Sequence, residues 1–216
     1  MLEKDNEMRH SFLLLIVLSL CLTIAVPSVR SQSDIQYRVD SLTIGVSDLE
    51  QVRQVVGEPE SRKKGAEFYE VLRDGKLDGL YLEKTLNFGW MKVDIQKGER
   101  IIGNKRIVYD FEYPKHGISV TLLDNPWQVN AISITNKDVE VEDIRVGDKL
   151  KKVEKLLGQG EWLTTDGEDE WWAEYEKKGV RYFFKADAKS PKYPMKLAKE
   201  KIVIKIEKYD TKVSFS

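Results

Sequence analysis

The sequence predicts an α+β fold of two tandem units, each a short helical segment packed on an antiparallel β-meander. Three observations predict it: an internal repeat, a helix motif in each copy, and strand-like segments separated by turn signals after each helix. We expect the first unit over residues 35–137 and the second over residues 138–216. A signal peptide is expected to precede them at residues 1–31.

The internal repeat pairs residues 42–57 with residues 144–158. When the two segments are aligned on their closing glycines, their apolar residues recur at the same helical spacing, with a one-residue slip near the first glycine. The pattern predicts one short amphipathic helix over residues 48–56 and another over residues 149–157.

Each predicted helix has end signals. Ser47, followed three residues later by Glu50, is the expected N-cap of the first helix, and Asp148 is the expected N-cap of the second. Gly57 and Gly158 occupy the position where a left-handed residue commonly ends a helix. Both helices are therefore expected to be two turns long.

Segments rich in β-branched and aromatic residues follow each helix and predict strands. They are residues 66–73, 77–84, 105–113, 117–124 and 128–135 after the first helix, and residues 170–177, 180–186 and 201–209 after the second. Turn signals such as Asp74-Gly75 and Asn125-Pro126 separate them. The lysine-glycine turn at residues 177–179 predicts a hairpin between its flanking strands.

The second copy of the motif, Ile-x-Val-Gly-Asp-x-Leu-x-x-Val-x-x-Leu-Leu-Gly at residues 144–158, precedes a tyrosine-rich hairpin and a closing isoleucine-rich strand. This order resembles the repeat of SmpA/OmlA (BamE-like) and β-lactamase-inhibitor-protein-like exported domains. The resemblance implies a helical segment on one face of an antiparallel sheet. It also implies an envelope assembly factor, a protein inhibitor or a secreted module. Two departures are a missing lipoprotein cysteine and extra residues around 86–104.

An uncharged apolar run at residues 12–26 predicts export. As a helix it would rise roughly 22 Å at 1.5 Å per residue, short of the ~30 Å hydrocarbon core of a bilayer. Val29 and Ser31 fit the −3 and −1 positions of a signal-peptidase site, with cleavage after Ser33 as the alternative. We therefore expect a secreted or periplasmic protein with no membrane span after signal removal.

Two details of the signal affect its interpretation. Residues 3–7 are net acidic, whereas a start at Met8 would give the positively charged leader that export signals need, so we expect translation to begin there. Cys21 could be the lipidated residue of a lipoprotein, but lipoprotein signals need a small residue before the cysteine, and Leu20 holds that place. Anchoring at Cys21 is therefore not expected.

Composition narrows the chemistry. The formal net charge of −1, from 35 basic and 36 acidic residues, gives no electrostatic case for nucleic acid. Beyond residue 31 the chain has no cysteine and one histidine, His116, so disulfides, thiol catalysis and multi-histidine sites are not available. No glycine spacing suits a bound nucleotide. We therefore predict no cofactor, no resident metal and no catalytic residues.

Aromatic residues are concentrated in the second unit. The candidate partner-binding residues are Trp162, Trp171, Trp172, Tyr175 and Tyr182. Because successive strand residues point to opposite faces, they cannot all lie in one core. Core and cross-strand packing is one interpretation, and an exposed aromatic platform for a protein or a glycan is the other.

Several features have weaker functional interpretations. Trp90 and Trp127 in the first unit could belong to a matching aromatic surface. The acidic run at residues 166–170 suggests calcium, but its spacing does not match an EF-hand loop, and a solvated turn is expected. The lysine-rich stretch at residues 189–201 is expected to be a loop, with contact to anionic envelope surfaces as an alternative.

Together these observations predict a non-enzymatic exported protein that binds a macromolecular partner, a protein or a glycan of the cell envelope, through a sheet face. The alternative is an envelope enzyme, a carboxylate-based glycan hydrolase, or a domain that binds glycans. A deep cleft holding two carboxylates about 5 to 9 Å apart would favour the hydrolase, and a shallow sheet face would favour binding.

Overall fold

The computed structural model describes residues 34–164, 170–185 and 201–211. Residues 35–216 form one compact unit. The predicted signal, with Met8 and Cys21, lies outside the described residues. So do nearly all of the acidic run at 166–170 and the lysine-rich stretch at 189–201. None of the helices in the described ranges is both long and apolar enough to cross a membrane.

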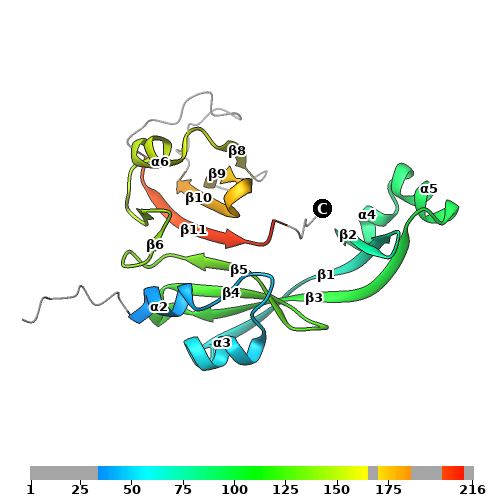
Figure 1. Cartoon of the computed structure of the whole chain (residues 1–216), viewed down its shortest axis with the longest axis horizontal. Coiled ribbons are helices and arrows are strands. Elements are labelled where there is room, and N and C mark those ends of the chain that lie inside the picture. Colours follow the sequence, from blue (N-terminus) through cyan, green and yellow to red (C-terminus); the bar gives the residue numbers. More distant parts are fainter. Residues whose placement is uncertain (1–33, 165–169, 186–200, 212–216) are drawn as a thin grey trace, which may run out of the picture. The chain divides into compact units, whose positions relative to one another are not determined.

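Nine strands form a single antiparallel sheet in the order β2-β1-β3-β4-β5-β11-β10-β9-β8 (Figure 1). Their bounds are β1 Ser61–Arg73, β2 Lys76–Tyr81, β3 Ile101–Tyr113, β4 Ile118–Leu123, β5 Gln128–Ile134, β8 Glu161–Thr164, β9 Glu170–Tyr175, β10 Val180–Lys185 and β11 Val203–Tyr209. A separate two-stranded ribbon consists of β6 Glu140–Val141 and β7 Ile144–Arg145.

The prediction of two tandem units, each with its own meander, was wrong. Strand β5, the last of the first meander, pairs with β11, the last of the second, so that Ile134 faces Ile206 and Ala131 faces Tyr209. A strand left at the edge of a sheet exposes unpaired backbone N–H and C=O groups, and this pairing satisfies them. We call the β5–β11 pairing the seam, because it joins the strands of both predicted units into one sheet.

The two repeat helices were predicted correctly within one residue. Helix α3 spans Leu49–Val56 and helix α6 spans Leu150–Leu157. The other helical segments are α2 Asp34–Asp40, α4 Glu83–Leu86, α5 Gly89–Lys97, and the 3-10 turns η1 Pro114–His116 and η2 Glu176–Lys178. The turn η2 joins β9 to β10 in the expected hairpin.

The predicted N-caps were wrong. Asp48 caps α3, because its carboxylate accepts a hydrogen bond from the N–H of Gln51 and the Gln51 side chain accepts one from the N–H of Asp48. Ser47 is buried, and its hydroxyl accepts from the N–H of Thr43 at 2.9 Å. Helix α6 begins after Lys149 without a side-chain cap. Helix α3 begins one residue later than predicted, and this shift makes Asp48, not Ser47, the residue that reaches the free N–H groups of the first helical turn.

The second copy of the motif uses its acidic residue differently. The carboxylate of Asp148 accepts from the backbone N–H of Arg145 at 2.8 Å and from the Lys152 ammonium at 2.7 Å. Burial raises the pKa of Asp148, but these hydrogen bonds outweigh it and leave the pKa below its usual value. Asp148 therefore stabilises the turn before α6 instead of capping the helix.

The sequence repeat has a counterpart in local geometry. The Tyr113 hydroxyl donates to the carbonyl of Gly57 at 3.4 Å, and the Tyr175 hydroxyl donates to the carbonyl of Gly158 at 3.0 Å. Both glycines end a helix with positive φ, at 102° and 80°. Each tyrosine is the last residue of a strand before a 3-10 turn, and its hydrogen bond connects that strand to the end of the helix in the same copy of the repeat.

The helices cover one face of the sheet. Val39 of α2, Val52 of α3 and Val153 of α6 pack in one core with the strand residues Ile132 and Ile206. Alternate residues of β4, β5, β9, β10 and β11 point to the other face, which we call the open face. Among the described residues, no α-helix residue lines the two recesses of this face.

The seam predicts how the protein unfolds. Replacing Ile206, which is fully buried opposite Ile134, with alanine should lower the free energy of unfolding by roughly 2–5 kcal/mol. Because one core spans both predicted units, the loss should appear as one shifted cooperative transition. Chemical denaturation followed by circular dichroism and by tryptophan fluorescence measures this.

The matched control is Ile202→Ala, since Ile202 is half exposed, and it should change stability by about 0.5 kcal/mol or less. Two separate transitions in the wild-type protein, only one of them moved by Ile206→Ala, would contradict a single shared core.

Candidate functional site

The open face holds a recess of about 460 Å³. Its lining comes from strands on both sides of the seam, with Asn130 from β5, Tyr209 and Glu207 from β11, Arg181 from β10 and Glu174 from β9. Because these strands are distant in sequence, only their pairing in one sheet brings the five side chains together.

Arg181 occupies the centre of this group. Its Nε donates to Glu174 Oε1 at 2.9 Å and its Nη1 donates to Glu207 Oε1 at 3.0 Å. The guanidinium carbon also lies 4.0 Å from the centre of the Tyr209 ring, within range of a cation–π interaction. Burial lowers the pKa of Arg181, but the two carboxylates outweigh it and raise the pKa above its usual value. Arg181 is therefore a fixed cation in the recess.

Two polar atoms of the recess are buried without a hydrogen-bond partner among the described residues: the side-chain oxygen of Asn130 and the hydroxyl oxygen of Tyr209. Asn130 is only 4% exposed. Burial, together with the Glu174 carboxylate toward which the hydroxyl directs its proton, raises the pKa of Tyr209, so the hydroxyl keeps its proton at neutral pH and its oxygen can still accept a hydrogen bond. Native proteins pair nearly all of their buried polar atoms, so these two require an explanation.

A β-bulge explains how Asn130 reaches the recess. Ala131 lies opposite Thr121 and Val129 lies opposite Leu122, so the residue between them has no partner on β4. A bulge re-aims the side chain of the extra residue. Asn130, in the middle of a buried apolar strand, thus lines the open face beside Ala131.

The recess is strongly acidic. Its lining includes five carboxylates and one guanidinium, a formal charge of −4. The carboxylates belong to Glu161, Glu174, Glu176, Glu207 and Asp210. Glu161 and Glu176 are exposed at the rim. Clustered charge of one sign in a concave site produces a negative potential that attracts cations and repels anions.

The carboxylates do not form a metal site. Within the described ranges, no three side chains of histidine, cysteine, aspartate or glutamate lie close enough to hold one ion. Glu174 and Glu207 are instead directed at the Arg181 guanidinium. The recess therefore offers separate oxygen acceptors to a ligand.

A second, shallower recess of about 420 Å³ lies on the same face. Glu112 of β3, Ser119 of β4, Ser133 of β5 and Lys205 of β11 line it. Ser133 also donates a hydrogen bond to Glu207 of the first recess at 3.3 Å. The two recesses are thus neighbours across the seam.

The five aromatic residues singled out from the sequence are distributed over both faces. Tyr182 is fully buried and donates to the carbonyl of Val141 at 3.0 Å, and Trp171 is 6% exposed. Trp162 and Tyr175 are half-buried against the helix-covered core. Trp172 is half-buried and is paired in register with an open-face residue of β10.

Trp172 begins a row of side chains on the open face. Its ring lies 5.5 Å from the ring of Phe183, and the Lys205 ammonium lies 3.8 Å from the centre of the Phe183 ring. The indole N–H of Trp172 is the third buried polar group without a hydrogen-bond partner in the described part of the chain. Of the five candidates, Trp172 is the one that adjoins the recesses.

The two tryptophans of the first predicted unit are in different surroundings. Trp127 is half-buried, 5.2 Å from the ring of Tyr109, with the Arg62 guanidinium over both rings. Trp90 of α5 is 55% exposed, and Phe88 just before it is 58% exposed.

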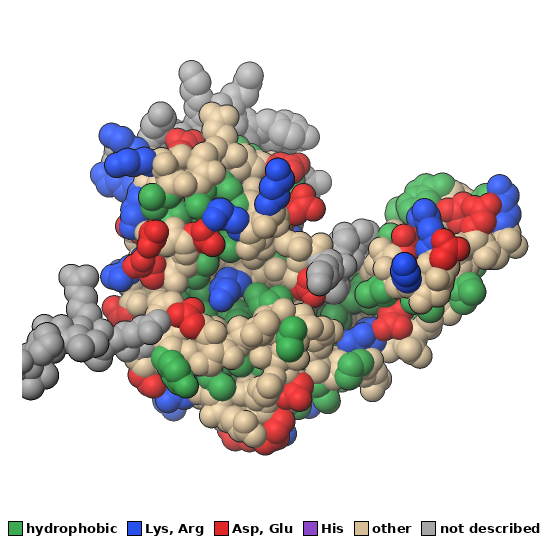
Figure 2. Space-filling view, viewed as in Figure 1, with side chains coloured by type: hydrophobic (Ala, Val, Ile, Leu, Met, Phe, Trp, Pro, Cys, Tyr) green, Lys and Arg blue, Asp and Glu red, His purple; other side chains and the backbone are tan. Residues whose placement is uncertain are grey.

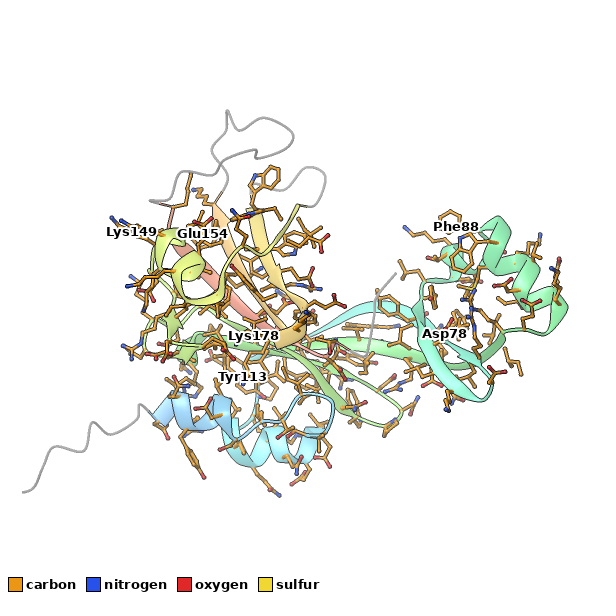
Figure 3. All side chains as sticks on the ribbon, turned by 45° about the horizontal axis from the view of Figure 1, so that its top comes forward. Asp78, Phe88, Tyr113, Lys149, Glu154 and Lys178 are labelled. Carbon is orange, nitrogen blue, oxygen red and sulfur yellow. The ribbon has the colours of Figure 1, made fainter. Side chains whose placement is uncertain are left out.

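Trp90 and Phe88 belong to an exposed apolar surface on the segment from β2 to the start of β3 (Figure 2). This segment, where Figure 3 labels Phe88 and Asp78, carries six of the ten large exposed apolar side chains of the described residues. It is held together by Arg100, which pairs with Asp78 at 2.8 Å and Asp94 at 2.6 Å.

The recess residues were missed by sequence reasoning. Asn130, Arg181 and Glu207 each stand alone in an ordinary strand, and none forms a recognisable motif with its neighbours. Alternation along β11 could have placed Glu207 and Tyr209 on one face. The bulge that brings Asn130 to that face leaves no signal in the sequence.

No protein-family model and no curated protein sequence matches the chain. Three solved structures are similar to it. The uncharacterized protein YfeY from Escherichia coli is 12% identical, with 79% of this chain and 94% of that chain covered and a TM-score of 0.44. An extracellular protein containing an SCP domain from Bacillus anthracis is 9% identical, with 81% of this chain and 45% of that chain covered and a TM-score of 0.40. A cysteine-rich secretory protein from Staphylococcus aureus is 9% identical, with 76% of this chain and 42% of that chain covered and a TM-score of 0.33. These low scores leave the function to be argued from the site itself.

Burial predicts opposite results for two tryptophan substitutions. Trp171→Ala should lower the free energy of unfolding by roughly 3–5 kcal/mol, because it empties a buried position. Trp90→Ala should change it by about 1 kcal/mol or less, since that ring is more than half exposed and packs mainly on Arg100. Urea denaturation of the two variants beside the wild type measures both. Equal losses would contradict the assignment of Trp171 to the interior.

Proposed function

We propose that this protein is an exported, non-enzymatic binding module that holds a partner protein on the open face of its sheet. The observation that carries the proposal is the acidic recess, in which the side chains of Asn130 and Tyr209 present buried polar oxygens without protein partners. A bound partner would satisfy these atoms, because an unpaired buried polar group costs about 1–3 kcal/mol.

The wider face supports a macromolecular partner. Two recesses lie on neighbouring strands, and the row of Trp172, Phe183 and Lys205 adjoins them. Phe183 is buried, and Trp172 and Lys205 on either side of it are half-buried. Partly exposed aromatic and cationic side chains beside concave surfaces are typical of the residues that contribute most to protein–protein binding. A surface that extends across the sheet in this way fits a protein segment better than a small molecule.

The arrangement favours binding over glycan hydrolysis. A carboxylate-based hydrolase needs two carboxyl groups that face the substrate from opposite sides of the scissile bond. Glu174 and Glu207 both pair with the Arg181 guanidinium instead, and Glu161 and Glu176 are exposed at the rim of the recess. The charges of Glu174 and Glu207 are used to hold the floor of the recess.

Blocking the face tests the proposal. Ser119 is half-buried in the second recess, and its side chain makes no hydrogen bond within the described part of the chain. Ser119→Arg would therefore place a long cation across the open face without breaking such a bond. The purified protein should capture a specific partner from the host's envelope and secreted fractions, and Ser119→Arg should reduce capture at least tenfold. Affinity capture followed by mass spectrometry, and then binding to the purified partner, measures this.

The matched control is Gln54→Arg, which adds the same side chain to the exposed surface of α3 on the helix-covered face. It should capture the same partner at the wild-type level. If Ser119→Arg, folded to the same melting temperature, binds the purified partner as tightly as the wild type, the open face is not the binding surface.

A further inference from the structure

We infer that the acidic recess receives a primary ammonium group, the side chain of a lysine on the partner protein. The inference rests on the proposed function and names the chemistry by which the open face would recognise its partner. The supporting observation is that the buried side-chain oxygens of Asn130 and Tyr209 lie in the same recess as the exposed carboxylates of its rim.

The charge of the recess selects a cation. Arg181 already pairs with Glu174 and Glu207, so its single positive charge compensates one of these two carboxylates. Glu161 and Glu176 at the rim have no described lysine or arginine partner. Their charges remain available to a ligand, and an anionic ligand would meet only repulsion from them.

The unpartnered atoms select a hydrogen-bond donor. The Asn130 side-chain oxygen can only accept, and the Tyr209 hydroxyl oxygen can accept while its proton points elsewhere. A ligand that donates to both would satisfy the buried atoms that the fold leaves unpaired. Net positive charge and several N–H donors in one small group are the properties of an ammonium or a guanidinium.

The geometry favours an ammonium over a guanidinium. A guanidinium binds best to paired acceptors, such as one carboxylate, and to an aromatic face. Arg181 already occupies the Tyr209 ring and the Glu174 and Glu207 carboxylates. The remaining buried acceptors are the single oxygens of Asn130 and Tyr209, which suit the rotatable donors of an ammonium, while the exposed rim carboxylates supply negative charge.

The test is a titration of the purified protein with a capped lysine peptide, followed by NMR of its side-chain amide and backbone signals. Saturable binding should shift the Asn130 signals. Asn130→Leu should weaken binding about tenfold, because it removes a hydrogen bond to a charged group. Asn130→Asp should strengthen binding, an outcome that a purely structural role for Asn130 would not produce.

Removing the rim carboxylates tests separately whether their negative charge contributes to binding of the lysine peptide. The double variant Glu161→Gln, Glu176→Gln should weaken binding roughly threefold to fivefold and reduce its dependence on salt concentration. The matched control is Glu50→Gln, which removes one exposed carboxylate from α3 and should leave binding unchanged.

Two further probes distinguish the sources of an ammonium. The same peptide with an acetylated lysine should not bind, and equal binding would overturn the inference. Cadaverine should compete with the lysine peptide at similar affinity. Binding of cadaverine without binding of the lysine peptide would show a free diamine site and would overturn the assignment to a partner lysine.

The inference and the proposed function can fail separately. If neither the lysine peptide nor cadaverine binds, while Ser119→Arg still abolishes partner capture, the inference is wrong and the proposed function stands. If the lysine peptide binds at Asn130 but Ser119→Arg leaves partner binding unchanged, the recess recognises an ammonium and the proposed docking face is wrong.

Discussion

The pairing of β5 with β11 is the interaction on which the rest of the structure depends. Through it Ile134 meets Ile206 on the helix-covered face, while Ser133 meets Glu207 and Ala131 meets Tyr209 on the open face. The same few residue pairs therefore join the hydrophobic core of the chain on one side and assemble the acidic recess on the other. Without the seam there would be two smaller sheets, and Asn130 would lie far from Arg181.

The features that sequence reasoning predicted correctly are local. Helices α3 and α6 follow from apolar spacing and a closing glycine within a few residues, and the hairpin around η2 follows from one short turn. The seam is not local, since Ser133 and Glu207 are 74 residues apart. The alternation of apolar and polar residues along a strand shows which side chains are buried. The same alternation suits an edge strand and an interior strand, so the sequence of β5 did not reveal that β11 lies beside it.

The candidate site was hidden for a related reason. The five side chains at its centre come from four strands, and a bulge decides the direction of Asn130. The conspicuous aromatic cluster drew attention instead, although Tyr182 and Trp171 belong to the interior. The abundance of aromatic residues in this part of the sequence largely reflected the composition of the core. The buried polar atoms without hydrogen-bond partners could be found only from the three-dimensional structure.

The seam also bears on the order in which the chain folds. The β3–β4–β5 meander and the β9–β10 hairpin pair residues close in sequence and close short loops, whereas β5–β11 contacts carry the higher entropic cost of a long loop. We expect the local meanders to form first and the seam to close last. Because the lining of the acidic recess comes from strands on both sides of the seam, the recess would then be among the last parts of the molecule to form.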